Sequence, residues 1–191
     1  HEYFHLVASL NFRNVPLWLN EGLADFYGNT AIIGNQARIG NLSRNQLEHL
    51  QRQGPLPLDE LLAADRDSPH YQDSEKAALF YSQSWALVHY LLLAEDGAHA
   101  HRLWQLLELL AHDVPALEAH RRALGDFRTW EARLRRYVSG GEFPSLALKF
   151  EPAPDLQAYS SRVLSGAETA AVRGDFLLHA GRLSEARALL E

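Results

Sequence analysis

The first ten residues limit the possible fold and function of the chain most. They combine apolar residues at helical spacing with two imidazoles at the same spacing. Between His1 and Leu10 apolar side chains are dense and few polar ones interrupt them, which is typical of a mostly buried helix. His1 and His5 are four residues apart, so on a helix they lie on the same face. Two imidazoles on one face can bind the same metal ion. The sequence therefore predicts a helix that carries part of a metal site.

A second helix follows after a short turn. Pro16 suits the first position of a helix, and the apolar residues from Leu17 to Tyr27 continue it until Gly28. The turn at residues 11–14 is short, so the second helix cannot lie far from the first. We therefore expect two buried helices packed close together.

The second helix carries two carboxylates with suitable spacing. Glu21 lies sixteen residues after His5, and a carboxylate on the neighbouring helix is the simplest third ligand beside His1 and His5. Asp25 is four residues further on the same face, where it can accept the outer N–H of a ligating imidazole. With no cysteine in the chain, any metal must be held by histidine and carboxylate ligands.

Glu2 has a different expected role. It lies three residues from His5 on the same broad side of the first helix, close enough to contact a metal-bound water without itself binding the metal. A zinc ion with three protein ligands and an open position lowers the pKa of its water to about 7. Glu2 would take the proton and pass it to a leaving amine, which predicts hydrolysis by metal-activated water.

In "HEYFH" followed by "WLNEGLADFYG", the chain resembles the gluzincin metallopeptidases, in which HExxH is followed by a glutamate ligand in an NExxxD or NEGxA setting. The later segment "FYSQSWALVHYLL" is similar to the matching helix of the peptidase MA-like branch, a bacterial group that often carries tetratricopeptide repeats. The resemblance covers residues 1–138 and is strongest over the first 28. It implies zinc bound by His1, His5 and Glu21, with Glu2 as general base and acid and Asp25 orienting a zinc-bound histidine.

Tyr81 has two interpretations. It lies 60 residues after Glu21, and in aminopeptidase-like gluzincins a downstream tyrosine donates a hydrogen bond to the tetrahedral oxyanion. Its helical stripe with Trp85 and Val88 is equally what any buried helix shows. The sequence leaves both the catalytic and the core role open.

The remaining histidines have no defensible ligand spacing. His89, on the long helix, is expected to be a hydrogen-bonded core residue, and His99 and His101 are expected at the surface because residues two apart on a helix point to different sides. The other five are His49, His70, His112, His120 and His179.

The rest of the chain is expected to be mainly helical. A short hairpin is predicted over 30–39 with its turn at Gly34-Asn35. Helices are predicted from apolar spacing, caps and breakers at 43–53, 59–64, 74–94, 98–111, 115–124 and 127–138.

The C-terminal part contains a different pattern. Residues 142–154 hold three prolines and look extended, which indicates a boundary. Beyond it, "RGDFLLHAGRLSEARALLE" matches the small and large positions of a tetratricopeptide repeat. We therefore divide the chain into a metallopeptidase catalytic helical portion at 1–141, a linker at 142–155 and a partial repeat at 156–191.

The expected fold is thus mainly α: a gluzincin-type helical subdomain with a short β-hairpin, followed by the start of a helical repeat. The expected function is zinc-dependent hydrolysis of a peptide or protein substrate, with the repeat recruiting a protein partner. A catalytically inactive peptidase-fold scaffold is the alternative, and a hydrolase acting on another carbonyl group is a third possibility. The formal net charge of −6 gives no overall attraction for nucleic acid, and no apolar run is long enough to span a membrane.

The ends of the chain also carry an expectation. It opens on His1 and contains no methionine, which indicates a piece of a longer protein. Gluzincins place a β-sheet before the HExxH helix, and its edge strand pairs with the peptide substrate. We therefore expect the isolated segment to be weakly active or inactive.

Overall fold

Helix α6 (Ser74–Leu93) is the element around which the first part of the chain packs. The computed structural model describes residues 1–140, 142–151, 160–179 and 181–190. These divide into two compact units, residues 1–153 and 154–191. Within the first unit α6 contacts α2, α3, α4, α5, α7 and α9. The helices of this unit besides α6 are α1 (Glu2–Asn11), α2 (Leu17–Gly28), α3 (Arg44–Gln53), α4 (Leu58–Ala63), α5 (Pro69–Gln72), a 3-10 turn η1 (Ala94–Gly97), α7 (Ala100–Ala111), α8 (Ala116–Leu124) and α9 (Phe127–Gly140).

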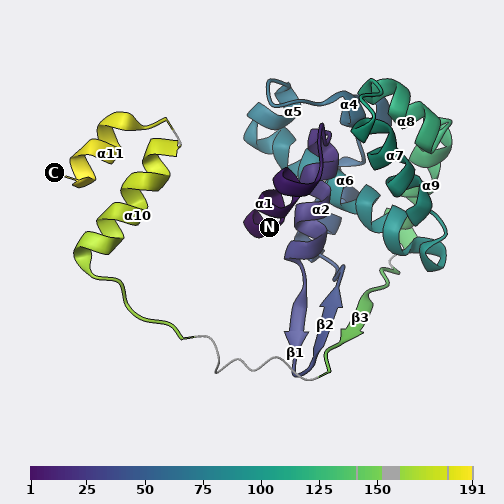
Figure 1. Cartoon of the computed structure of the whole chain (residues 1–191). Helices are drawn as coiled ribbons and strands as arrows, with labels where there is room; N and C mark the ends of the chain where they lie inside the picture. Colours follow the sequence, from purple (N-terminus) through teal and green to yellow (C-terminus); the bar gives the residue numbers. More distant parts are fainter. Residues whose placement is uncertain (141, 152–159, 180, 191) are drawn as a thin grey trace. The chain divides into compact units, whose positions relative to one another are not determined.

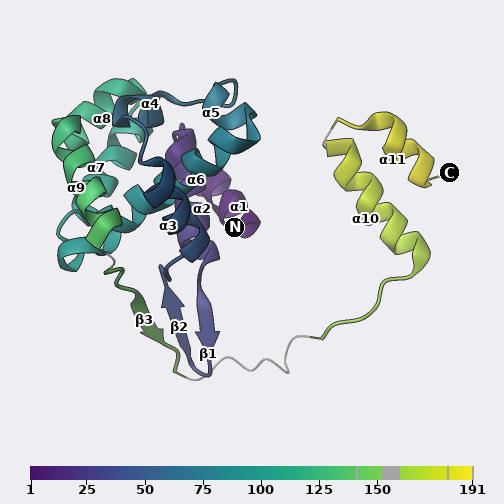
Figure 2. The same ribbon diagram turned by 180° about the vertical axis from the view of Figure 1, so that it is seen from behind.

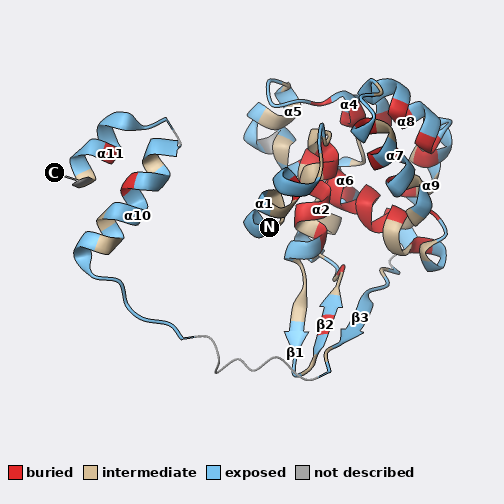
Figure 3. Cartoon of the chain, in the orientation of Figure 1, coloured by how far each residue is buried: buried red, intermediate tan, exposed pale blue. Residues whose placement is uncertain are grey.

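The core of the first unit is built around α2 and α6 and extends into α3, α4, α7, α8 and α9. Its largest fully buried side chains include Trp18, Phe80 and Trp85, and Figure 3 shows buried residues along α2 and α6 as well as in α4, α7, α8 and α9. A Cβ at Gly22 would lie 2.5 Å from the backbone oxygen of Ser84, which is too close for any residue with a side chain. The glycine therefore allows α2 and α6 to pack closely. This close packing fixes the face of α2 that carries Glu21.

The first unit also contains a small antiparallel sheet. The predicted hairpin is confirmed as β1 (Ala31–Ile33) and β2 (Gln36–Ile39), joined through Gly34 at a φ of +60°. A third strand, β3 (Leu146–Lys149), pairs with β2 in the order β1-β2-β3. The strands lie together at one end of the helices in both views (Figures 1 and 2). The predicted linker over 142–155 therefore contains a strand that belongs to the first unit; residues 152–155 lie outside the described part.

The prediction of a mostly buried first helix is wrong. Among the residues of α1 only Ala8 is buried, while Tyr3 and Leu10 are each 77% exposed. The physical reason is that α1 packs along one side on α2, where Phe4 stacks on Tyr27 at 5.4 Å between ring centroids. Apolar residues are dense in α1, but half of them face away from this contact.

Two predictions for the other histidines had different outcomes. His89 is fully buried and hydrogen-bonded, with Nε2 2.8 Å from the carbonyl of Gly40 and Nδ1 2.7 Å from the hydroxyl of Tyr137, so its core role is confirmed. The surface placement of His99 is wrong: it is 9% exposed, because it precedes α7 and its ring lies against Trp130. His101 is exposed as expected.

The second unit contains two helices, α10 (Gly166–His179) and α11 (Leu183–Leu190), which pack on each other. Gly181, at a φ of +74°, forms the turn between them, and Arg182 N donates to the carbonyl of Leu177 at 2.8 Å. Gly174 and Ala186, two of the small positions of the repeat pattern, are buried.

The fold is thus mainly helical with one small three-stranded antiparallel sheet. None of the helices that the structure describes combines the length and the apolar character needed to cross a bilayer.

Candidate metal centre

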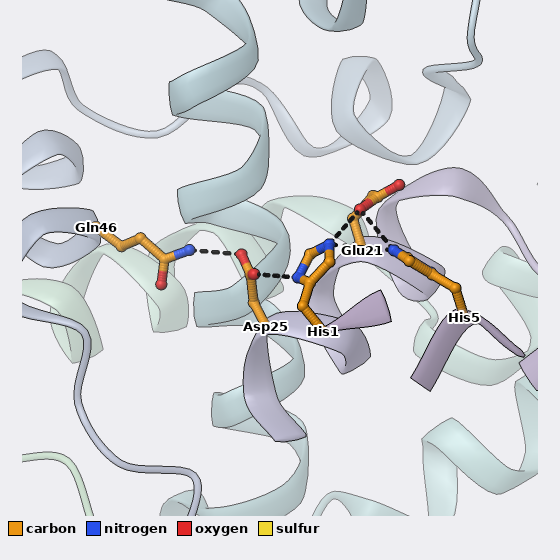
Figure 4. Close-up of polar contacts among 5 residues, drawn as sticks. All are labelled: His1, His5, Glu21, Asp25 and Gln46. Atoms are coloured by element: carbon orange, nitrogen blue, oxygen red, sulfur yellow. Dashed lines mark hydrogen bonds and ion pairs between the residues drawn. The ribbon is translucent and has the colours of Figure 1, made fainter. Parts of the chain in front are cut away.

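The side chains of His1 at the N-cap of α1, His5 on α1 and Glu21 on α2 converge on one point. Nε2 of His1 and Nε2 of His5 lie 3.1 Å apart, and Oε2 of Glu21 lies 3.5 Å from the first and 3.4 Å from the second. Figure 4 shows both imidazoles directed at the same carboxylate. Among the described residues this is the one group of three or more potential ligands close enough to hold a metal ion.

The spacing of the three atoms fits a tetrahedral metal ion. With bonds of about 2.0 to 2.1 Å, two ligand atoms of tetrahedral zinc lie roughly 3.3 to 3.4 Å apart. The three distances measured here, 3.1, 3.4 and 3.5 Å, lie around that value. Two imidazoles and one carboxylate are also a ligand set of catalytic zinc sites, in which a fourth position stays open. The residues present therefore fit zinc in both geometry and donor chemistry.

Asp25 contacts the ring nitrogen of His1 that does not face Glu21. Its Oδ1 lies 2.8 Å from Nδ1 of His1, and its Oδ2 accepts a hydrogen bond of 2.6 Å from Nε2 of Gln46, which lies on α3 (Figure 4). When the Nδ1–H of His1 donates a hydrogen bond to Asp25, the free lone pair of the ring lies on Nε2, the atom that faces Glu21. Asp25 thus takes the position expected from the sequence. The other imidazole lacks such support, because Nδ1 of His5 has no hydrogen-bond partner among the described residues.

Burial sets the electrostatics of the two carboxylates. Glu21 is 6% exposed, and burial raises its pKa, while the nearby charge of His5 lowers it. Burial likewise raises the pKa of Asp25, and the hydrogen bond from Gln46 opposes that shift. A buried carboxylate is costly unless a positive partner compensates it, so this arrangement favours a cation between the imidazoles and Glu21.

Glu2 and Tyr81 lie near this cluster but outside the ligand set. Glu2 is exposed on α1, and its charge contributes to the raised pKa of Glu21. Tyr81 is half-buried on α6. Its pKa is raised by burial, by the hydrogen bond with Tyr71 and by the charge of Glu21. Both groups are therefore close enough to interact electrostatically with the Glu21 carboxylate.

Two residues of this region were missed by sequence reasoning. The helix that carries Gln46 was predicted, but nothing local indicates that it lies beside Asp25. Arg66, in the loop between α4 and α5, has a charge that reaches Glu21 from a point 45 residues away in sequence. Neither residue belongs to a motif, so only the packing of the helices could reveal them.

Comparison with known proteins gives one match. A family model described as "Protein of unknown function (DUF1570)" matches residues 6–115, more than half of the chain. No curated protein and no solved structure matches. The matched range contains Glu21, Asp25 and Tyr81, and it begins directly after His5.

Proposed function

The chain belongs to the DUF1570 family of proteins of unknown function, and we propose that it hydrolyses peptide bonds by means of a zinc ion held by His1, His5 and Glu21. The single observation that carries the proposal is the spacing of the three ligand atoms, 3.1 to 3.5 Å, with His1 oriented by Asp25. Hydrogen bonds alone would not require two imidazole nitrogens and a buried carboxylate oxygen to point at a common centre.

When bound, zinc would supply the Lewis acidity that makes a water molecule nucleophilic near neutral pH. Glu2 follows His1 directly in the chain and would accept the proton of that water, then give it to the amine of the departing product. Asp25 would keep the lone pair of His1 on Nε2 throughout.

Tyr81 completes the proposed set as a hydrogen-bond donor. A phenol hydroxyl is protonated at neutral pH, and burial raises the pKa of Tyr81 further, so this hydroxyl remains a hydrogen-bond donor. A hydroxyl beside the metal site can donate to the oxygen on which negative charge develops as the peptide carbonyl is attacked. We assign Tyr81 this catalytic role in place of a purely structural one.

The gluzincin arrangement belongs to the proposal as well. It is supported by the order of three features along the chain, which resembles that class: HExxH at the start of α1, "NEGLAD" on α2 and a tyrosine on α6. The helix pair α10 and α11 is in turn proposed as part of a tetratricopeptide-like repeat that recruits a protein partner.

The experiment that tests the function combines metal content with activity. Zinc is measured in the purified full-length protein, and hydrolysis of a peptide library is followed before chelation, after it, and after zinc is restored. The proposal expects zinc-dependent cleavage, and it expects Glu2→Gln to retain zinc while turnover falls by orders of magnitude. Normal turnover in Glu2→Gln would overturn the mechanism, and bound zinc without cleavage of any peptide would favour the scaffold alternative.

A further inference from the structure

A cavity of about 520 Å³ borders α2, the helix that carries the ligand Glu21. It is lined by the start of α2, the end of α4 and the start of α8. Leu17 and Asn20 contribute to it from α2, and Leu17 lies one helical turn before the ligand Glu21. The cavity therefore opens on the same stretch of α2 that carries the metal ligand.

The walls of this cavity are mostly apolar, with one cation at the edge. Val15, Leu17, Leu62 and Leu117 supply apolar surface. Arg66 is the one basic residue among the described residues that line it. A pocket with apolar walls and a single guanidinium suits a ligand that has an apolar body and one anionic group.

The guanidinium of Arg66 is available for such a ligand. In the part of the chain that the structure describes, no carboxylate oxygen lies within ion-pair distance of it. Asp65 also lines the cavity, but its Oδ1 accepts hydrogen bonds from the hydroxyl of Ser68 at 2.8 Å and from the backbone of Asp67 at 3.1 Å. The carboxylate of Asp65 is therefore hydrogen-bonded within its own loop.

The backbone of Arg66 is also held in place. Nε2 of Gln72, at the end of α5, donates to the carbonyl of Arg66 at 2.6 Å. The loop that carries Arg66 is therefore anchored where it borders the cavity.

We propose that this cavity is a substrate subsite in which Arg66 binds a carboxylate of the peptide while the apolar walls take the side chain of the same residue. The inference rests on the peptide hydrolysis proposed above. Guanidinium and carboxylate groups pair through two parallel hydrogen bonds, which gives both affinity and orientation. The carboxylate comes either from the C-terminus of the peptide or from an acidic side chain. The apolar walls favour the C-terminus, because the terminal residue can then offer an apolar side chain as well.

The test measures binding without turnover. The zinc-loaded Glu2→Gln protein is titrated calorimetrically with three peptides of equal length: one with an apolar C-terminal residue and a free carboxylate, its C-terminal amide, and an amide that carries an internal glutamate. The titrations are repeated with Arg66→Ala, Arg66→Lys and the exposed control Arg128→Ala, each in the Glu2→Gln background, after the zinc content of every protein has been measured.

The proposal expects the free acid to bind about tenfold more tightly than its amide. This ratio should fall to about one in Arg66→Ala, be partly kept in Arg66→Lys, and be unchanged in Arg128→Ala. Tight binding of the internal glutamate peptide instead would identify an acidic side chain as the source of the carboxylate.

Three results would overturn the subsite: equal affinities for all three peptides, no binding of any of them, or an acid preference that survives in Arg66→Ala. In a protein that binds zinc and hydrolyses peptides, these results count against the subsite alone. A protein that lacks zinc and cleaves no peptide would contradict the proposed function instead.

Discussion

Nδ1 of His1 lies 2.8 Å from Oδ1 of Asp25. Asp25 is on α2, which a four-residue turn and Pro16 separate from α1. The same carboxylate accepts a hydrogen bond from Gln46 on α3, so three helices meet behind one imidazole. The far nitrogen of that ring faces the buried oxygen of Glu21. In this way the core of the unit, through α2 and α3, holds a side chain at the N-cap of the largely exposed helix α1.

Removing this support should weaken metal binding while leaving the ligands in place. We expect Asp25→Ala to lower the affinity for zinc by about 10- to 100-fold, since residues that orient metal-binding histidines typically contribute that much. Competition with a zinc chelator measures the change, and Glu48→Ala, an exposed acid on α3, serves as the control. Equal affinities in wild type and Asp25→Ala would show that the contact does not act on the site.

Tyr81→Phe should separate catalysis from metal binding. The hydroxyl is the proposed donor to the oxyanion, and loss of such a donor lowers kcat by roughly 10²- to 10³-fold. Zinc content and thermal stability are expected to stay close to wild type, because the aromatic ring and its packing on Phe80 and Tyr71 are kept. Unchanged turnover in Tyr81→Phe would show that Tyr81 has a structural role in the core and no catalytic role.

The contact between α2 and α6 gives a prediction on stability. A Cβ at Gly22 would lie 2.5 Å from the carbonyl oxygen of Ser84, so Gly22→Ala should lower the free energy of unfolding by about 1 to 3 kcal/mol or more. Gly140→Ala is the matched control, because a Cβ there meets nothing within 4 Å. Chemical denaturation measures both, and a Gly22→Ala protein as stable as the control would show that the helices can separate without cost.

Apart from the metal site, a buried histidine makes the stability depend on pH. Trp18 Nε1 donates to Nε2 of His120 at 3.0 Å, and burial lowers the pKa of His120 to about 4. Because the unfolded state takes up the proton near pH 6.5 and the folded state resists it, stability is full above that pH and is lost as pH falls toward 4. We expect a loss of about 3 kcal/mol from this group between pH 7 and pH 4.

The substitution that checks this is His120→Gln, which keeps an acceptor for Trp18 but does not titrate. Unfolding is followed between pH 7 and pH 4 with a chelator present, so that the metal ligands are compared in the same state. The pH dependence should be shallower in His120→Gln by about the stated amount. Identical slopes in the two proteins would contradict the assignment.

Much of the helical framework could be predicted because its signals are local. The apolar run of α2, the turn at Gly34 and the cap at Asp126, which accepts from the backbone N–H of Thr129 at 3.3 Å, each depend on neighbouring residues only. The convergence of His1, His5 and Glu21 could be anticipated for the same reason, since a short turn joins their helices.

What could not be predicted depends on contacts between distant segments. The strand β3 pairs with β2 across more than a hundred residues, and Gln46 reaches Asp25 only because α3 packs beside α6. The burial of His99 against Trp130 and the exposure of α1 likewise depend on which helix faces pack against another segment of the chain. Periodicity shows that a helix has an apolar side, but it does not show how much of that side is covered.

The most direct test of the account is the zinc K-edge X-ray absorption spectrum of the zinc-loaded protein, compared with that of His5→Ala and Glu21→Ala. The account predicts one zinc ion per chain with two imidazole nitrogens at about 2.0 Å. It also predicts that His5→Ala loses the scattering of one imidazole and that Glu21→Ala loses the metal. A protein that binds no zinc, or one whose zinc spectrum is the same in all three forms, would contradict the central claim.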